Sequence, residues 1–256
     1  MFGIGPVTGF YDLLDLAHDR LLQLEVEPAG LGWLNGDVYV DSCPESLRRH
    51  DDPPAPTRAL SIQPFTFSAP SPSSNPRPLR RRDRPLVYVG LGTVVNRFGD
   101  VLERLIGELA ELPIDAIVTA GPGRDLDELH PPHAGLRIEQ YVPLDELVPA
   151  CDAVVCHAGW VTTMAALAHG VPMVLVPIAA DQPDIASRCN EAGVSRTVAP
   201  TDVGSGAVAA ALTAVLDEDT HRVNAERISS EIQHMPAPLG VARDIETIIA
   251  LDDRVW

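Results

Sequence analysis

The sequence contains no lysine, so each of its 19 basic side chains is an arginine, and 36 acidic side chains outnumber them. The formal net charge is -17 at pH 7. A chain of that charge repels a polyanion, and we therefore expect no nucleic-acid partner. A small phosphorylated ligand is still allowed, because a pocket can neutralise phosphate locally with backbone amides and one or two side chains.

Cysteines and long apolar runs are also scarce. The four cysteines, Cys43, Cys151, Cys156 and Cys189, form no C-x-x-C pair, and a chain of 256 residues does not need disulfides to fold. No apolar run has the length of a membrane span, and the start, MFGIGPVTGF, contains neither a charged leader nor a long hydrophobic stretch. We therefore expect a cytoplasmic protein without a membrane span.

Residues 1–68 contain too few elements for a complete sheet. The segment 11–24 carries a stripe of leucines and one alanine, which predicts an amphipathic helix that needs a partner surface. The segment 38–40 (VYV) predicts a short strand ended by a turn. This opening section is therefore expected to be part of a larger domain.

Proline, serine and arginine dominate residues 69–85, a composition that disfavours helix and sheet and predicts an extended linker. Its arginines could form a polyanion site, but we interpret them as a solvated linker in an acidic chain. They are Arg77, Arg80, Arg81, Arg82 and Arg84.

Residues 86–256 show a regular alternation of short apolar runs and helical stretches. Each run has about five hydrophobic residues, as expected when helices cover both faces of a parallel sheet. The pattern predicts an α/β domain with a Rossmann-like, doubly wound parallel sheet, followed by helical segments in the tail. The predicted strands lie in LVYVGLG (86–92), IDAIVTAG (114–121), LRIEQYV (136–142), DAVVCHA (152–158) and PMVLVPI (172–178).

In such a sheet, ligands bind at the carboxyl ends of the strands. After the first predicted strand, Gly92 allows close backbone approach, and Thr93 offers a hydroxyl to a phosphate oxygen. The G-x-G start also fits a dinucleotide fingerprint and hence an NAD-dependent oxidoreductase. Val95 replaces the third glycine of that fingerprint, however, which weakens this alternative.

The segment HAGWVTTMAALAHGVP (157–172) predicts a loop, one short helix that Gly170 ends, and a turn into the next strand. The amino terminus of this helix is expected to point into the ligand crevice. Its unpaired amides, from Trp160 to Thr163, and the helix dipole suit a diphosphate, to which His157 can donate a hydrogen bond. The alternative for His157 is an ordinary histidine at a strand end.

Asp181 and Gln182 follow the last predicted strand. Together they can accept from and donate to the hydroxyls of a sugar ring. The alternative is that Asp181 caps a helix that runs through Cys189.

The motifs H-x-G, G-V-P and P-x-x-x-D-Q, in this order and at these spacings, resemble the donor-binding segment of nucleotide-sugar glycosyltransferases. These enzymes have two facing α/β domains, the GT-B fold, and the likeness is to bacterial enzymes that glycosylate macrolides and other natural products. It continues through LVYVGLGTVVN, QYVPLDELVPACDAVVCHAG and GVPMVLVPIAADQPDIASRCNEAGV. Residues 1–65, with GFYDLL and DSCPESL, resemble the end of the family's acceptor domain.

The resemblance implies that a hexose passes from a UDP- or TDP-sugar to a hydroxyl of a small-molecule acceptor, without a metal cofactor. Residues 1–68 would be a remnant of the acceptor domain, and residues 86–256 would be the donor-binding domain. The implied donor contacts are Val142 to the base, then Thr93, His157 and Thr162 to the diphosphate, with Gly159, Trp160 and Val161 in the same loop, and Asp181 and Gln182 to the sugar.

The chain departs from the family pattern at Val161, where glycine is usual, at Ala165, where many relatives have glutamate for the ribose, and at Ile185, where asparagine is usual. A branched side chain at 161 is expected to strain a positive φ and to crowd the ligand.

Nothing in residues 1–65 matches the family's histidine base, since His18 and His50 fit surface or packing roles. Loss of a base costs roughly a hundredfold to ten-thousandfold in rate. The alternative function is therefore a non-catalytic nucleotide-sugar-binding partner or remnant, which lacks the acceptor domain or pairs with a separate one.

Overall fold

The computed structural model describes residues 38–52, 58–65, 83–92, 100–126, 129 and 135–252. The chain divides into two compact units, the larger made of Phe65–Ser230 and the smaller of Met1–Pro64 with Glu231–Trp256. The predicted helix at 11–24, His18, the linker up to residue 82 and Thr93 lie outside the described residues. The domain boundaries at 68 and 86 stay predictions.

The larger unit is built on a six-stranded sheet in the order β5-β4-β3-β6-β7-β8. Every neighbouring pair is parallel. The sheet confirms the predicted fold class, and its first five strands fall inside the five predicted runs, whereas β8 was not predicted. The strands are β3 (Leu86–Gly90), β4 (Asp115–Thr119), β5 (Leu136–Glu139), β6 (Ala153–Cys156), β7 (Met173–Leu175) and β8 (Ser195–Thr197).

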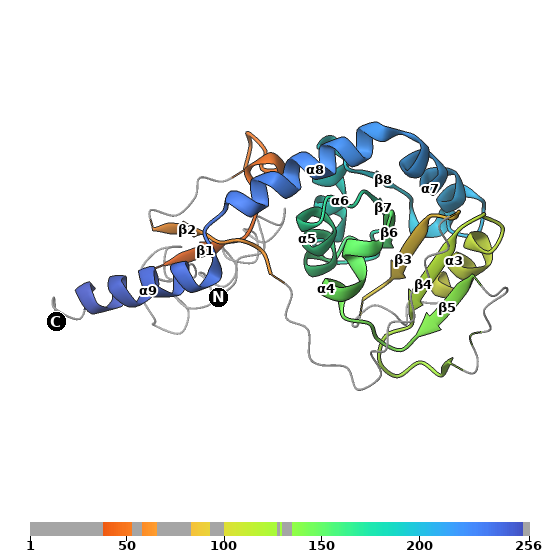
Figure 1. Cartoon of the computed structure of the whole chain (residues 1–256), viewed down its shortest axis with the longest axis horizontal. Coiled ribbons are helices and arrows are strands. Elements are labelled where there is room, and N and C mark those ends of the chain that lie inside the picture. The colour runs from red at the N-terminus through yellow and green to blue at the C-terminus, as the bar shows by residue number, and fades with distance from the viewer. Residues whose placement is uncertain are drawn as a thin grey trace, which may run out of the picture. The chain divides into compact units, whose positions relative to one another are not determined.

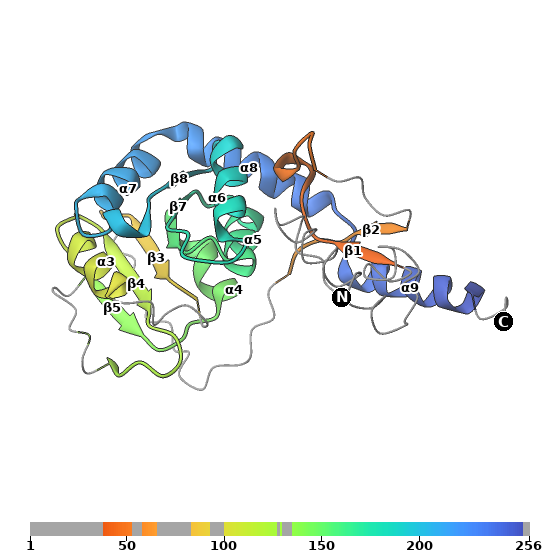
Figure 2. The ribbon, with the colours of Figure 1, turned by 180° about the vertical axis from the view of Figure 1, so that it is seen from behind.

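Two helices, α3 (Val101–Leu109) and α7 (Ala207–Asp217), cover one face of this sheet. The buried residues of α3 recur at helical spacing, and they form one hydrophobic cluster with buried residues of α7 and alternate residues of the strands. Figures 1 and 2 show α5 (Trp160–Ala168) and α6 (Gln182–Glu191) on the other side of the central strands. Both faces are therefore covered, which explains the continuous hydrophobic runs.

The predicted end of the helix after β6 is confirmed. Gly170 lies just beyond α5 at φ +66, the left-handed conformation that glycine adopts without strain. The remaining helices of this unit are short or follow the sheet: α4 (Leu144–Leu147), η3 (Val148–Ala150), η4 (Pro200–Asp202) and α8 (Asp219–His234), whose last turn belongs to the smaller unit.

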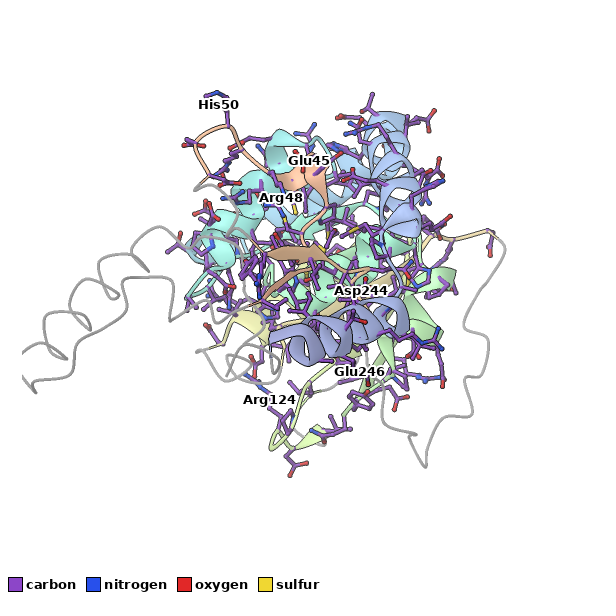
Figure 3. All side chains as sticks on the ribbon, turned by 90° about the vertical axis from the view of Figure 1, so that its left-hand side faces the viewer. Glu45, Arg48, His50, Arg124, Asp244 and Glu246 are labelled. Carbon is purple, nitrogen blue, oxygen red and sulfur yellow. The ribbon has the colours of Figure 1, made fainter. Side chains whose placement is uncertain are left out.

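The smaller unit contains the parallel strands β1 (Tyr39–Asp41) and β2 (Ala59–Ser61), the turn η1 (Glu45–Leu47) and the helix α9 (Pro238–Asp252). The predicted strand at 38–40 is thus confirmed, one residue later. Arg48 pairs with the buried Asp41, and Figure 3 shows it beside Glu45, with His50 at the outer end of the turn. His50 is exposed, as the sequence predicts.

None of the helices within the described residues is both long and apolar enough to span a membrane.

Candidate functional site

The topological switch point of the sheet lies between β3 and β6. From β3 the chain adds β4 and β5 on one side, whereas β6 is followed by β7 and β8 on the other side. At such a point, neighbouring strand-to-helix loops diverge and leave a crevice beyond the carboxyl ends of the strands. Gly92 lies two residues after β3, and His157 lies directly after β6, so both belong to this crevice.

The imidazole ring of His157 lies between two glycines. A Cβ built on Gly92 would come within 2.6 Å of Cε1 of His157, and a Cβ built on Gly159 would come equally close, 2.6 Å, to the same atom. Gly92 also has φ +77, which disfavours any side chain there. The sequence predicted that Gly92 leaves room for the close approach of a ligand. In the structure, the space that a side chain at residue 92 would fill is occupied by the His157 ring.

His157 is held in a partly desolvated position. Burial lowers the pKa of His157 from its usual 6.5, while the backbone of Gly90 and the negative charge of Asp181 act in the opposite direction. Its Nδ1 is buried and makes no hydrogen bond of standard geometry within the described residues, although the Gly90 backbone lies near the ring. The ring is therefore largely neutral at pH 7 and has spare capacity for hydrogen bonding.

Ala158 and Gly159 turn the chain from β6 into α5. Ala158 is buried and has φ +63, and Gly159 is the extended N-cap residue, with φ -67. Thr163 N donates to Gly159 O at 2.9 Å, and this bond closes the first turn of α5. The positive end of the helix dipole therefore lies directly beside His157.

The side chains of this first turn differ in exposure. Trp160 is half-buried and Thr162 is buried, whereas Val161 is 58% exposed. The expectation of a strained φ at residue 161 is wrong, because Val161 is helical and the left-handed residue of this loop is Ala158. Helical side chains lean towards the amino terminus, so Val161 lies over the end of the helix.

Asp181 and Gln182 begin α6 after the turn that follows β7. Asp181 occupies the N-cap position, but its half-buried carboxylate makes no capping hydrogen bond. Gln182 is only 4% exposed, and its Oε1 accepts hydrogen bonds from Ile178 N at 2.8 Å and Ala179 N at 3.0 Å. The sequence predicted two ligand-binding side chains here. The Asp181 carboxylate makes no bond to its own helix, whereas the Gln182 oxygen is already used within the turn, so of the Gln182 side chain only the amide nitrogen is left for a ligand.

The other predicted donor contacts are more scattered. Val142 is half-buried in the loop after β5, with β4 between β5 and the switch point. Ala165 and Ile185 are each 4% exposed, so both side chains are buried. Thr93 lies outside the described residues. No group of three or more histidine, cysteine or acidic residues suited to a metal occurs among those that are described.

Two features of the site were not predicted from the sequence. One is the left-handed conformation of Ala158 and Ala180, which alanine normally avoids. No sequence motif predicts this conformation. The other is the return of the Gln182 side chain onto its own turn. The spacing of Gln182 four residues after Ile178 permits this contact but does not distinguish it from a side chain that faces solvent.

Comparison with known proteins bears on this arrangement. Residues 103–248 match the family described as erythromycin biosynthesis protein CIII-like, C-terminal domain. The chain is 32% identical over 217 residues to 4'-demethylrebeccamycin synthase of Lentzea aerocolonigenes, a match that covers 83% of this chain and 50% of that protein.

Two solved structures have the same fold. Glycosyltransferase SnogD from Streptomyces nogalater is 26% identical with a TM-score of 0.68, covering 82% of this chain and 57% of that one. Spinosyn rhamnosyltransferase SpnG, complexed with thymidine diphosphate, is 25% identical with a TM-score of 0.69, covering 82% of this chain and 56% of that one. The chain spans about half the length of the curated relatives it matches.

The family match extends from α3 to α9 and takes in every described site element after β3, which confirms the resemblance first seen in the motifs. The chain belongs to the erythromycin biosynthesis protein CIII-like C-terminal domain family, and its relatives are glycosyltransferases of antibiotic biosynthesis.

Proposed function

We propose that this chain binds a UDP- or TDP-hexose and stabilises its diphosphate as a leaving group, in hexose transfer to a hydroxyl of a small-molecule natural product. The observation that carries the proposal is the convergence of the His157 ring and the amino terminus of α5 at the switch point of the sheet. A diphosphate gains from both, through backbone amides and a ring that can donate a hydrogen bond.

In this reaction the acceptor oxygen attacks the anomeric carbon, the bond to the β-phosphate oxygen breaks, and the nucleoside diphosphate leaves with the electron pair. Negative charge grows on the diphosphate during this step. The helix terminus and His157 are preorganised for that charge, so they stabilise the transition state more than the ground state. We expect no metal cofactor, and binding should be unchanged by EDTA or added Mg²⁺.

The remaining donor contacts are assigned by analogy with the family. Asp181 and the free amide nitrogen of Gln182 would hold sugar hydroxyls, Val142 would contact the base, and Thr93 and Thr162 would contact the diphosphate. The complex of the rhamnosyltransferase SpnG with thymidine diphosphate supports a thymidine nucleotide as one candidate.

The proton of the acceptor hydroxyl must pass to a base. His50 is exposed on a turn of the smaller unit, and we do not assign it that role. We infer that an α/β acceptor domain, on a separate chain or segment, supplies the base and the acceptor pocket. The greater length of the relatives supports this partner.

The experiment is calorimetric titration of the purified chain with TDP, UDP and their glucose conjugates. One nucleotide should bind with micromolar affinity, and His157→Ala should weaken it. Asp181→Ala combined with Gln182→Ala should weaken only the glucose conjugate. Undiminished binding of the conjugate to the double variant would show that the sugar lies elsewhere.

A second candidate function is a nucleotide-sugar-binding partner without catalysis, favoured by the exposed Val161 over the helix terminus. If Val161 shields the amides of the first turn, Val161→Gly should bind nucleoside diphosphate at least tenfold more tightly. Val223→Gly is the matched control, because Val223 is 59% exposed on α8. Equal affinities of Val161→Gly and the parent chain would remove this argument.

A further inference from the structure

The turn between β7 and α6 is held by one buried side chain. Oε1 of Gln182 accepts from Ile178 N and Ala179 N, at 2.8 and 3.0 Å, and Gln182 N donates to Ala179 O at 3.3 Å. The side chain is 4% exposed, so loss of the oxygen would leave two amides of a partly buried turn unsatisfied. An unsatisfied buried amide costs more free energy than the hydrogen bond itself contributes.

Ala180, at the end of this turn, is left-handed with φ +56. The left-handed conformation is unfavourable for a residue other than glycine, because its Cβ comes too close to the following carbonyl oxygen. Its side chain is exposed, so no packing of the methyl group offsets that cost. Such strain persists only where the surroundings enforce it, and the hydrogen bonds of Gln182 on the two preceding amides do so.

The enforced turn decides where the next residue faces. Asp181 follows Ala180, and although it stands at the N-cap position its carboxylate makes no bond to its own helix. Its negative charge acts instead on His157, across the crevice at the end of β6. Among the described residues, the only two with positive φ other than glycines are Ala158 and Ala180, and each directly adjoins one of these two side chains.

We propose that Gln182 is a positioning residue, which through its hold on the turn at 178–180 and the left-handed Ala180 aims the Asp181 carboxylate at the sugar. The inference rests on the proposed function, since it takes Asp181 to be the sugar contact. We infer that a substitution of Gln182 weakens sugar binding mainly because it loosens the backbone turn, and only to a smaller extent because a direct contact with the ligand is lost.

Variants of Gln182 and Ala180 test the inference, with TDP, UDP, TDP-glucose and UDP-glucose as probes. Gln182→Met has similar length but no acceptor, and it should weaken binding of the glucose conjugate about tenfold, the value of one hydrogen bond to a charged group. Binding of the free diphosphate should be preserved. Gln182→Glu keeps the accepting oxygen, and it should lose less affinity for the glucose conjugate than Gln182→Met.

The exposed Ala180 allows the same test without any change to Gln182. Ala180→Val cannot hold a left-handed turn, and it should lose more affinity for the glucose conjugate than Ala180→Gly, which can. Ala242→Val is the matched control, because Ala242 is exposed on α9. If Gln182→Met does not fold, this pair of variants still decides the inference.

A double-mutant cycle separates positioning from direct contact. In the Asp181→Ala background, Gln182→Met should have little further effect on binding of the glucose conjugate, and additive losses would overturn the inference. Hydrogen exchange of the Ile178 and Ala179 amides should accelerate in Gln182→Met but not in Gln182→Glu; unchanged exchange would also overturn it. If the parent chain binds none of the probes, the proposed function fails, while the exchange measurement still reports on the turn.

Discussion

His157 is the residue whose charge should respond to the ligand. Because burial lowers its pKa, the folded protein at pH 7 holds a ring that is mostly neutral. A bound diphosphate adds negative charge nearby and must raise that pKa, so binding takes up a proton. Affinity should therefore rise as the pH falls from neutrality through the usual histidine pKa of 6.5 and towards the lowered pKa of the free protein.

Calorimetry in buffers of different ionisation enthalpy measures this proton uptake directly. The ligand's own phosphate also titrates near this range, and His157→Gln is therefore the reference. The excess uptake of the parent chain over His157→Gln belongs to His157. Equal uptake by both proteins would mean that His157 stays neutral in the complex.

The two glycines beside His157 leave the space that its ring occupies, so a side chain at either position should displace the ring. Gly159 has φ -67, which alanine tolerates, so Gly159→Ala should act only through the collision of its Cβ with the ring. The displaced ring should cost at least tenfold in nucleotide affinity, with little loss of stability. Gly107→Ala is the control: no atom lies within 4 Å of its added Cβ, and in mid-helix it should stabilise the protein by about 0.5–1 kcal/mol without changing affinity.

The sequence motifs predicted which residues line the site but not the conformation of its loops. The motifs predicted His157 and Asp181 as site residues, because polar side chains after parallel strands meet at one edge of a sheet. They could not show that the Gln182 oxygen turns back on its own backbone, nor that two alanines adopt left-handed φ. Both depend on the packing of separate loops.

At the scale of elements, α3 and α7 are joined by Glu108. Its carboxylate accepts from Gly204 N at 2.7 Å and from Ala209 N at 2.8 Å, and so caps a helix whose own N-cap residue, Gly206, has no side chain. Glu108→Ala should lower the free energy of unfolding by about 1–2 kcal/mol, as for loss of a good cap. Glu108→Gln, which keeps an acceptor, should lose less.

Urea denaturation of the three proteins measures this difference. Nucleotide affinity serves as the control, because the contact lies outside the proposed site and should leave binding unchanged. Equal stability of Glu108→Ala and the parent chain would mean that water caps α7 equally well.

The sequence predicted five of the six strands of the sheet and missed the last one, β8. The strands β3 to β7 could be located because helices on both faces require apolar residues throughout. The strand β8 could not, since Ser195–Thr197 is polar and pairs on one side only, with β7, at the edge of the sheet. Short edge strands take their conformation from the neighbour they pair with rather than from their own composition.

For the whole molecule, the formal charge of -17 opposes an anionic ligand at long range. Screening shortens the reach of that repulsion from about 30 Å at 0.01 M salt to about 8 Å at 0.15 M. The association rate of a fluorescent TDP analogue should therefore rise with added NaCl in stopped-flow measurements. A rate that falls with salt would mean that the field of the helix terminus, rather than the net charge, steers the approach.

The burial of all four cysteines has a practical consequence for labelling chemistry. Burial also raises the pKa of Cys151 and Cys156 to about 12, so little reactive thiolate forms there. With no lysine in the chain, amine-reactive dyes find no side chain either. A Val161→Cys substitution would therefore give one accessible thiol at the rim of the crevice. A maleimide fluorophore attached to this thiol would report ligand binding optically, and no native cysteine would have to be removed first.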